Sequence, residues 1–212
     1  MKTLFQSDFD GTITQEDVSF LILDAFASRD WRRLLDEYRE GKISVGSFST
    51  KAFSMVRADE QSVLKFVKRK AKIRPGFSEL LAYCHRRGFQ FVIVSNGMDF
   101  YIKAILEDIG INNIQVFAAQ TKFVADGIEA RYIGPEGNQL EDNFKEAYIK
   151  LFREKGYRVI YAGDGSSDIF PARQADYVFA TGKLLARCKA VNLDCTPFND
   201  LHDIVRNLEF LQ

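Results

Sequence analysis

Short apolar runs alternate along the chain with segments of helical periodicity. Runs rich in β-branched and aromatic residues predict strands at 3–7, 89–95, 157–162 and 177–180. Amphipathic segments at 77–87, 98–109 and 143–155 predict helices, and each is followed by a glycine that can end it. Strands that alternate with helices of about 10–15 residues are joined by crossover connections. The pattern therefore predicts an α/β fold built on a parallel sheet.

Two stretches interrupt this alternation. Residues 15–72 hold no strand-like run, and their amphipathic segments predict four short helices, at 18–27, 31–40, 45–56 and 62–71. In 121–134, Asp126-Gly127 stands between two alternating runs, which is a strong hairpin signal. We expect a core of residues 1–14 and 73–212 with a helical cap subdomain at 15–72. Both stretches are candidate covers for a pocket.

Composition and charge limit the partners. The chain has 212 residues, and 29 Lys and Arg balance 29 Asp and Glu, so the formal net charge is zero. Because there is no basic excess, we expect neither nucleic acid nor a membrane as a partner. The three cysteines lack metal-site spacing and suit a reducing cytoplasm. No run approaches the ~18 apolar residues that span a bilayer. The sequence predicts a cytoplasmic enzyme or binding domain, either a monomer or a homodimer.

Acidic residues follow two of the predicted strands. Asp8 and Asp10 lie two positions apart where the strand 3–7 ends, so an extended chain directs both side chains the same way. Asp164 and Asp168 follow the strand 157–162. In open parallel sheets the ligand crevice lies beyond the carboxyl ends of the strands. Carboxylates gathered there would repel one another without a cation, and hard oxygen donors suit Mg²⁺.

Other classes of site match these motifs less well. A lone Asp-x-Asp-Gly also forms turns, with Asp as a helix N-cap. A calcium loop that started at Asp8 would need Glu at its twelfth position, where Ser19 stands. In GDGSSD, Asp168 occupies the place of the third glycine of a dinucleotide fingerprint, and the sequence contains no G-x-x-x-x-G-K-[ST] loop.

Two further features point to a bound phosphate. Ser95-Asn96-Gly97 follows a predicted strand and opens the predicted helix at 98–109, where a hydroxyl, an amide and free backbone N–H groups can hold an anion. Lys145 begins another predicted helix and can bring a compact positive charge to the same place. The order of these features relative to the acidic pairs favours a phosphate site over separate helix caps.

The motifs together resemble a known superfamily. DFDGT at 8–12, Ser95-Asn96, Lys145 and GDGSSD at 163–168 are similar to the four motifs of the haloacid dehalogenase superfamily, in the same order. The segment 15–72 is similar to the cap of the phosphoserine phosphatase branch. The resemblance implies a phosphatase with a doubly wound, Rossmann-like parallel sheet and a small all-α cap inserted after the first strand. Dehalogenases lack an acid at the position of Asp10, so dehalogenation is not expected.

The resemblance also implies roles for the motif residues. Asp8 would be the nucleophile that forms an aspartyl-phosphate, and Asp10 would act as general acid and then general base. Mg²⁺ would bind the Asp8 carboxylate, the Asp10 main-chain carbonyl and Asp164. Support would come from Asp168 beside the metal and Thr12 in the nucleophile loop, and the phosphate oxygens would meet Ser95, Asn96, Gly97 and Lys145.

The resemblance implies a small-molecule phosphate ester as the substrate, with its identity determined by the cap. Phosphoserine phosphatases carry Glu nine residues after the nucleophile, whereas this chain has Asp17, a candidate specificity residue that is one methylene shorter. The stretches 72–77 and 95–102 resemble the methionine-salvage branch, which acts on 2-hydroxy-3-keto-5-methylthiopentenyl phosphate, and this branch ranks first. Phosphoserine and amino-alcohol phosphates remain alternatives, the latter because of 170–180. A phospho-acceptor signalling domain is the non-enzyme alternative.

Aromatic residues of the predicted cap allow two interpretations. They can shape a pocket that accepts a thioether, or they can pack the cap helices against one another, which aromatics at helical spacing do more often. The residues concerned are Phe20, Phe26, Trp31, Phe48 and Phe53.

Overall fold

The chain folds around one twisted sheet whose strands run mostly parallel. The computed structural model describes residues 2–210. The strand order is β5-β4-β3-β2-β1-β6-β7-β8. The strands span Lys2–Ser7 (β1), Gln90–Met98 (β2), Gln115–Val124 (β3), Gly127–Ile133 (β4), Gln139–Leu140 (β5), Tyr157–Gly163 (β6), Tyr177–Ala180 (β7) and Thr196–Pro197 (β8). Among these strands, the β3–β4 and β4–β5 pairs are antiparallel and the other pairs are parallel, which confirms the predicted α/β fold with a parallel sheet.

β1 lies at the centre of the sheet and is the strand from which the chain turns to either side. It pairs in parallel with β2 on one edge and with β6 on the other. Its side chains Leu4 and Phe5 are fully buried, and Phe5 stacks on Phe91 of β2 with ring centroids 5.3 Å apart. Ligand crevices in such sheets form at the carboxyl ends of the strands where the order reverses. The topology therefore marks the residues after Ser7.

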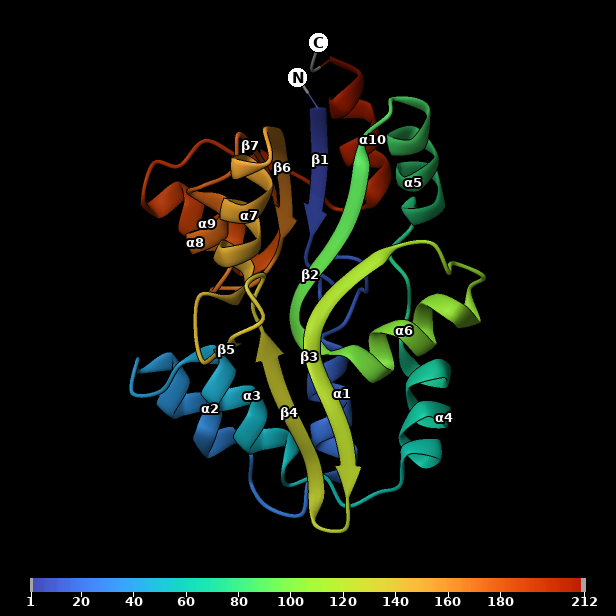
Figure 1. Cartoon of the computed structure of the whole chain (residues 1–212), viewed down its shortest axis with the longest axis vertical. Helices are drawn as coiled ribbons and strands as arrows, with labels where there is room; N and C mark the ends of the chain where they lie inside the picture. The colour runs from blue at the N-terminus through green and yellow to red at the C-terminus, as the bar shows by residue number, and fades with distance from the viewer. Residues whose placement is uncertain (1, 211–212) are drawn as a thin grey trace.

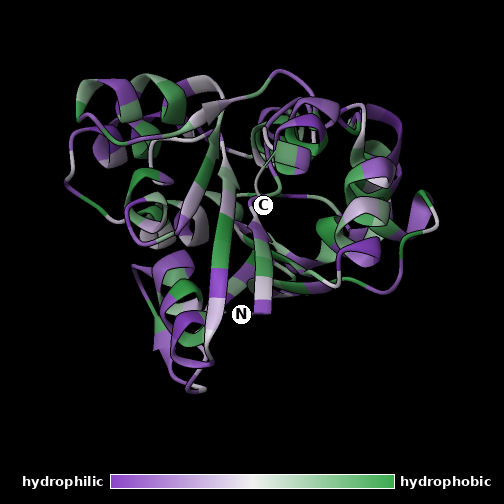
Figure 2. Ribbon diagram, turned by 90° about the horizontal axis from the view of Figure 1, so that it is seen from above, coloured by the Kyte–Doolittle hydropathy of each residue, from purple (hydrophilic) through white to green (hydrophobic). Residues whose placement is uncertain are grey.

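Helices cover both faces of the sheet, so it is doubly wound (Figure 1). On one side lie α5 and α10, and on the other lie α7, α8 and α9. Their bounds are Phe77–Arg86 (α5), Asp99–Asp108 (α6), Phe144–Glu154 (α7), Ile169–Ala172 (α8), Gly182–Ala190 (α9) and Leu201–Phe210 (α10). Viewed from above, the central strands are largely hydrophobic, and the helices carry both hydrophobic and hydrophilic residues (Figure 2). This is the pattern of a buried parallel sheet under amphipathic helices.

Four helices occupy the segment between β1 and α5, as predicted. They span Val18–Phe26 (α1), Arg32–Arg39 (α2), Val45–Phe53 (α3) and Glu60–Lys70 (α4). Asp17, Ser44 and Asp59 cap α1, α3 and α4 by accepting a backbone N–H of the first turn. The four helices lie beyond the carboxyl end of β1 (Figure 1). Their division from the core as a separate subdomain stays a prediction.

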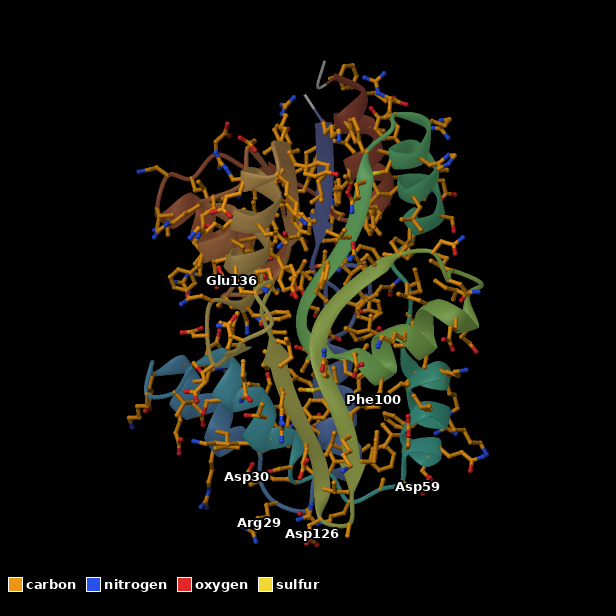
Figure 3. The ribbon with its side chains drawn as sticks, in the orientation of Figure 1. Arg29, Asp30, Asp59, Phe100, Asp126 and Glu136 are labelled. Carbon is orange, nitrogen blue, oxygen red and sulfur yellow. The ribbon has the colours of Figure 1, made fainter. Side chains whose placement is uncertain are left out.

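The predicted hairpin is present and belongs to a longer strand than expected. β3 pairs in parallel with β2 through its first half and antiparallel with β4 from Gln120 to Val124. Asp126 lies at the hairpin tip, and Phe100 of α6 packs edge-on against Phe123 of β3 with centroids 5.0 Å apart (Figure 3). Gly127 has φ +142°, and a Cβ there would lie 2.2 Å from the carbonyl oxygen of Ser54. The hairpin thus rests closely on the end of α3.

One predicted boundary is wrong. Ser95, Asn96 and Gly97 do not open a helix, because β2 continues to Met98 and α6 begins at Asp99. The pairing of β2 with β3 shifts register between Val94 and Met98. Residues 95–97 therefore form an irregular strand end just before the helix, where backbone groups leave the regular ladder.

No helix within residues 2–210 combines the length and the apolar character needed to cross a bilayer.

The contact of α3 with the segment after β5 gives a stability prediction. Gly46 lies in α3, and a Cβ there would lie 2.4 Å from the main-chain oxygen of Glu141. Alanine favours a helix over glycine by about 1 kcal/mol, but overpacking against backbone costs about 1–3 kcal/mol. We expect Gly46→Ala to lower the free energy of unfolding by up to about 2 kcal/mol in urea denaturation. Ser47→Ala, one residue further along α3, is the control and should change it little, and a Gly46→Ala protein more stable than wild type would contradict the contact.

Candidate active site

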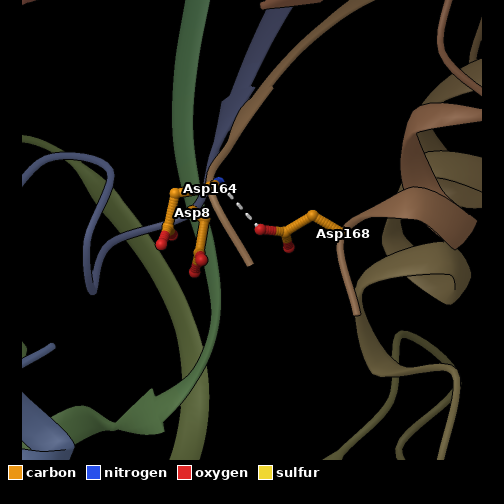
Figure 4. A group of neighbouring side chains, drawn as sticks. All are labelled: Asp8, Asp164 and Asp168. Atoms are coloured by element: carbon orange, nitrogen blue, oxygen red, sulfur yellow. Dashed lines mark hydrogen bonds between the residues drawn. The ribbon is translucent and has the colours of Figure 1, made fainter. Parts of the chain in front are cut away.

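Asp8 stands at the carboxyl end of β1, beside the end of β6. Its backbone N–H donates to the carbonyl of Ala162 at 2.9 Å, which extends the β1–β6 ladder by one residue. Carboxylate oxygens of Asp8, Asp164 and Asp168 all lie within 4.8 Å of one another (Figure 4). The strand order therefore brings together the two acidic motifs, as the sequence predicts.

Lys145, in the first turn of α7, supplies a positive charge to this acidic group. Its Nζ lies 2.9 Å from Oδ1 of Asp8 and 2.6 Å from Oδ1 of Asp168, and its side chain is 3% exposed. Burial alone would lower the pKa of Lys145, but Asp168 and Asp8 raise it above its ordinary value, so the ammonium stays charged. The Gln6 side chain donates to the carbonyl of Lys145 at 3.2 Å and holds the start of α7 against β1.

Asp168 is fully buried and has donors at both oxygens. Oδ1 accepts from Lys145 and from the Tyr161 hydroxyl, each at 2.6 Å. Oδ2 accepts from the backbone N–H groups of Asp164 and Gly165 at 3.0 and 2.8 Å. Because four donors already use its acceptor sites, Asp168 is suited to fixing Lys145 and the 163–168 loop rather than to binding a metal directly.

Asp164 faces Asp8 across the turn that follows β1. Its Oδ1 accepts from the Thr12 hydroxyl at 3.1 Å. Gly11 has φ +73°, and a Cβ there would lie 2.4 Å from Oδ2 of Asp164, so the turn must carry glycine to come this close. Burial, with the negative charges of Asp8 and Asp168, raises the pKa of Asp164 to about 8.

Asp8 and Asp164 fit a divalent cation. Burial raises the pKa of Asp8 to about 6, against the lowering effect of Lys145. Oδ1 of Asp8 is buried and ion-paired with Lys145, and within the described residues it receives no hydrogen bond. Two carboxylates that are crowded, buried and short of donors gain from a hard cation that takes oxygen ligands.

Asp10 is held by residues from two helices. Oδ1 accepts from the backbone N–H of Val18, the first residue of α1, at 3.0 Å, and Oδ2 accepts from the Tyr101 hydroxyl. Tyr101 is fully buried in α6, and its hydroxyl also lies 2.8 Å from Oγ of Ser19. Burial, followed by the charge of Asp17, raises the pKa of Asp10 well above its ordinary value. A carboxyl group with a raised pKa holds its proton to higher pH, which suits a general acid.

The irregular end of β2 lies beside the carboxylates. Ser95 is almost fully buried, and its Oγ accepts from the N–H of Gly97 at 3.0 Å. The Tyr132 hydroxyl donates to the carbonyl of Asn96. A Cβ at Gly97 would lie 2.1 Å from the Tyr101 hydroxyl and 2.5 Å from Oδ2 of Asp10, so only glycine fits there. The N–H of Gly97 is already bonded, whereas the hydroxyl hydrogen of Ser95 remains available to an anion.

A cavity of about 1030 Å³ opens over these residues and is closed on its far side by α1, α2 and α3. The acidic residues, Lys145 and residues 95–97 form its floor. Apolar side chains from the helical segment form the opposite wall, and basic ones also line the cavity: Phe20, Leu35, Ile43, Val45 and Phe48, and Arg39, Lys42, Lys183 and Arg187.

The aromatic residues of the helical segment pack its helices together, and two of them also line the cavity. Phe20 packs on Trp31 with centroids 4.9 Å apart and edge-on against Phe48 at 6.4 Å. Of the five aromatics considered, Phe20 and Phe48 line the cavity, and Phe26, Trp31 and Phe53 are absent from its lining. The cluster therefore packs these helices together and also turns two rings toward a ligand.

Asp17 lies in the cavity wall but also caps α1. It accepts from the N–H of Phe20 at 3.0 Å, and burial raises its pKa to about 6. One of its oxygens is thus used within the helix, which weakens Asp17 as a partner for a substrate ammonium group.

Sequence reasoning missed several residues of the site. The hydroxyls of Tyr101 and Tyr161 donate to Asp10 and Asp168. The Tyr132 hydroxyl donates to the carbonyl of Asn96, and the Ser19 hydroxyl is bonded to that of Tyr101. In the sequence, the tyrosines lie within apolar segments and match the pattern of ordinary core residues. Tyr101 falls within the stretch 95–102 already noted for its resemblance, and that was its only signal.

The fold and this site define a phosphatase of the haloacid dehalogenase type. The family model for haloacid dehalogenase-like hydrolases matches residues 6–172, and the chain belongs to that family. Together with the relatives below, this makes the protein a phosphoric monoester hydrolase that acts on a small phosphate metabolite. The predicted superfamily and enzyme class are confirmed.

The relatives with the most similar sequences include two bacterial enzymes. Each is named 2-hydroxy-3-keto-5-methylthiopentenyl-1-phosphate phosphatase. The one from Geobacillus kaustophilus is 31% identical, covering 97% of this chain and 94% of its own. The one from Brevibacillus brevis is 28% identical, covering 100% and 97%. Among solved structures, a phospho-aspartyl intermediate analogue of phosphoserine phosphatase superposes with a TM-score of 0.72 at 21% identity, covering 97% and 98%. This structural likeness shows the shared fold.

The opposite situations of Asp168 and Asp164 give a prediction on stability. Asp168→Asn replaces a carboxylate with a neutral amide, so the buried ammonium of Lys145 loses one of its two negative partners. We expect the free energy of unfolding to fall by about 3–5 kcal/mol. Asp164→Asn removes one of three crowded carboxylates, so in a chelator it should raise the melting temperature.

The gain from Asp164→Asn should depend on pH. The pKa of Asp164 rises from 3.8 to about 8 on folding. The folded wild type therefore binds the extra proton in this range and loses stability as pH rises from about 4 to about 8. Thermal unfolding of both proteins with EDTA should show the advantage of Asp164→Asn growing over that range. A constant difference would contradict the crowding of the carboxylates.

Proposed function

We propose that the protein is a Mg²⁺-dependent phosphatase that works through a phosphoryl group on Asp8, and that its substrate is 2-hydroxy-3-keto-5-methylthiopentenyl-1-phosphate or a close analogue. The observation that carries the proposal is the placing of Asp8. Its buried carboxylate is ion-paired with Lys145, adjoins Asp164 and faces a cavity whose lining combines apolar and polar side chains of the helical segment.

In the first half of the reaction, a carboxylate oxygen of Asp8 attacks phosphorus, and the bond from phosphorus to the ester oxygen breaks. The buried ammonium of Lys145, the Ser95 hydroxyl and the Asn96 amide face the phosphate and offset its charge. Asp8 and Asp164, with the main-chain carbonyl of Asp10, would hold Mg²⁺. When bound, the cation lowers the repulsion between the anionic nucleophile and the phosphate dianion.

Asp10 moves the proton in both halves. It gives its proton to the ester oxygen as the alcohol leaves. In the second half it takes a proton from the water that attacks the phosphoryl group on Asp8, which releases phosphate and restores both carboxyl groups. The raised pKa of Asp10 supports this role, because the acid must hold a proton when the substrate arrives.

Asp168 and Thr12 act through their neighbours. Asp168 fixes Lys145, and Thr12 fixes Asp164. Because neither residue is among those that line the cavity, we propose that both position their neighbours and do not contact the substrate.

The cavity wall supports a substrate with an apolar tail. Phe20, Leu35 and Phe48 offer an apolar surface opposite the carboxylates, and the relatives are named for an ester that carries a thioether. Phosphoserine and amino-alcohol phosphates carry an ammonium group, for which Asp17 is the available carboxylate, and this residue already caps α1. We therefore rank the thioether ester first and propose residues 15–72 as the cap that selects it, in a cytoplasmic monomer or homodimer.

The covalent mechanism predicts a strict need for Asp8. With p-nitrophenyl phosphate and Mg²⁺, Asp8→Asn should lower kcat by at least about a thousandfold, and EDTA should inhibit wild type reversibly. After acid quench, wild type should carry a hydroxylamine-labile phosphoryl group that Asp8→Asn lacks. Asp126→Asn, at the exposed hairpin tip, is the matched control and should behave as wild type. Equal phosphate release by the Asp8→Asn protein would reject the mechanism.

The apolar wall predicts a selective effect of one cap residue. Among metabolite phosphates, the thioether ester should have the highest kcat/KM. Phe20→Ala should reduce its preference over an ester without the tail by about tenfold or more, as expected for a lost apolar contact. Phe26→Ala removes an aromatic from the same helix outside the cavity lining and should keep the preference. A panel in which phosphoserine is the best substrate would contradict the assignment.

A further inference from the structure

Both carboxylate oxygens of Asp10 accept a hydrogen bond, one from a backbone N–H and the other from a side-chain hydroxyl. The donor at Oδ1 is the backbone N–H of Val18, at 3.0 Å. An amide N–H can only donate, so Oδ1 always accepts. The carbonyl oxygen of a carboxylic acid is its better acceptor, so the N–H of Val18 favours the proton of Asp10 on Oδ2, which is the oxygen that the Tyr101 hydroxyl contacts.

The Tyr101 hydroxyl can serve Asp10 with or without that proton. A hydroxyl both donates and accepts. Ser19 Oγ lies 2.8 Å from the Tyr101 hydroxyl, and either atom can be the donor. Tyr101 can thus donate to the Asp10 carboxylate, or accept from the Asp10 acid while donating to Ser19. The pair of hydroxyls matches a carboxyl group that alternates between the two forms.

The surroundings leave the Tyr101 ring little freedom. It is fully buried, with Phe9 and Phe100 at centroid distances of 6.4 and 5.4 Å. Gly97 has no space for a Cβ beside the hydroxyl. The hydroxyl position, and with it the direction of Oδ2, is set by the core helix α6.

We infer that Tyr101 is a positioning residue for proton transfer by Asp10, aided from the α1 side by Ser19. The inference rests on the proposed function. As phosphorus leaves the ester oxygen, the Oδ2 proton gives up its bond to the Tyr101 hydroxyl and moves to that oxygen, and the Tyr101 hydroxyl turns its own proton from Ser19 to Oδ2. As water attacks the phosphoryl group on Asp8, a water proton returns to Oδ2. Tyr101 keeps its own proton and holds Oδ2 toward the reacting oxygen in both steps.

The test compares two leaving groups in Tyr101→Phe. Phenyl and p-nitrophenyl phosphate share a ring, but phenolate is far more basic and needs the proton as it leaves. The parameter kcat/KM reports the step in which the leaving group departs, because that step forms the phosphoryl-enzyme. We expect Tyr101→Phe to lower kcat/KM at least about tenfold for phenyl phosphate, within the range of general acid catalysis, and less than about threefold for p-nitrophenyl phosphate.

Two further variants separate positioning from simple loss of structure. Tyr83→Phe removes another buried hydroxyl, which is remote from the site and donates to the carbonyl of Leu208 at 2.9 Å. This variant should leave kcat/KM unchanged for both substrates. In an Asp10→Asn background, Tyr101→Phe should cause no further selective loss, since its effect acts through Asp10. If Tyr101→Phe does not fold, Ser19→Ala takes its place and should show a weaker loss with the same selectivity.

Equal losses for both substrates, or no loss, would overturn the role of Tyr101. So would an undiminished selective loss in the Asp10→Asn background. These results are distinct from a failure of the proposed function, which would appear as full activity of Asp8→Asn with both substrates.

Discussion

The buried ammonium of Lys145 is the interaction on which the site depends. It lies between Asp8 and Asp168, almost free of solvent, and joins the ends of β1 and β6 to the start of α7. A buried charge of this kind is tolerated only when its partners are present and well oriented. Asp168 meets that condition with four donors of its own. Asp8 has the ion pair with Lys145 but no hydrogen bond at Oδ1 within the described residues, which is why we propose it as the nucleophile.

Close backbone approach lets the carboxylates share so small a space. At Gly11 and Gly97, the position of a Cβ is already taken by oxygen atoms of Asp164, Asp10 or Tyr101. The central place of β1 then directs the group into the crevice between β2 and β6. Electrostatics and topology act together here, because the sheet gathers carboxylates that a cation can bind beside the buried ammonium of Lys145, which an anion can approach.

The sequence predicted the features that depend on residues close together in the chain, and it missed those that depend on contacts between distant residues. Asp126-Gly127 forms the hairpin because turn chemistry lies within a few residues. The acidic motifs follow strands, and parallel strands bring their ends together, so Asp8 and Asp164 were predictable. The Tyr101 contact with Asp10 joins residues 91 positions apart, and nothing in a tyrosine's neighbours distinguishes a bonded hydroxyl from core packing. The end of β2 was predicted at Ser95, but its irregular pairing with β3 continues the strand to Met98.

Because β3 pairs with both β2 and β4, the helical segment cannot simply be exchanged with that of a relative. One end of the strand belongs to the sheet beside β2, and the other carries β4, whose Ile128 and Tyr132 are buried and which packs against α3. Residues 15–72 therefore do not form a self-contained module. A chimaera that grafts a foreign helical segment onto this core would leave an apolar strand face uncovered, so the hairpin must be transplanted with the helices. The unit that packs beyond the sheet is thus built from two separate pieces of the chain.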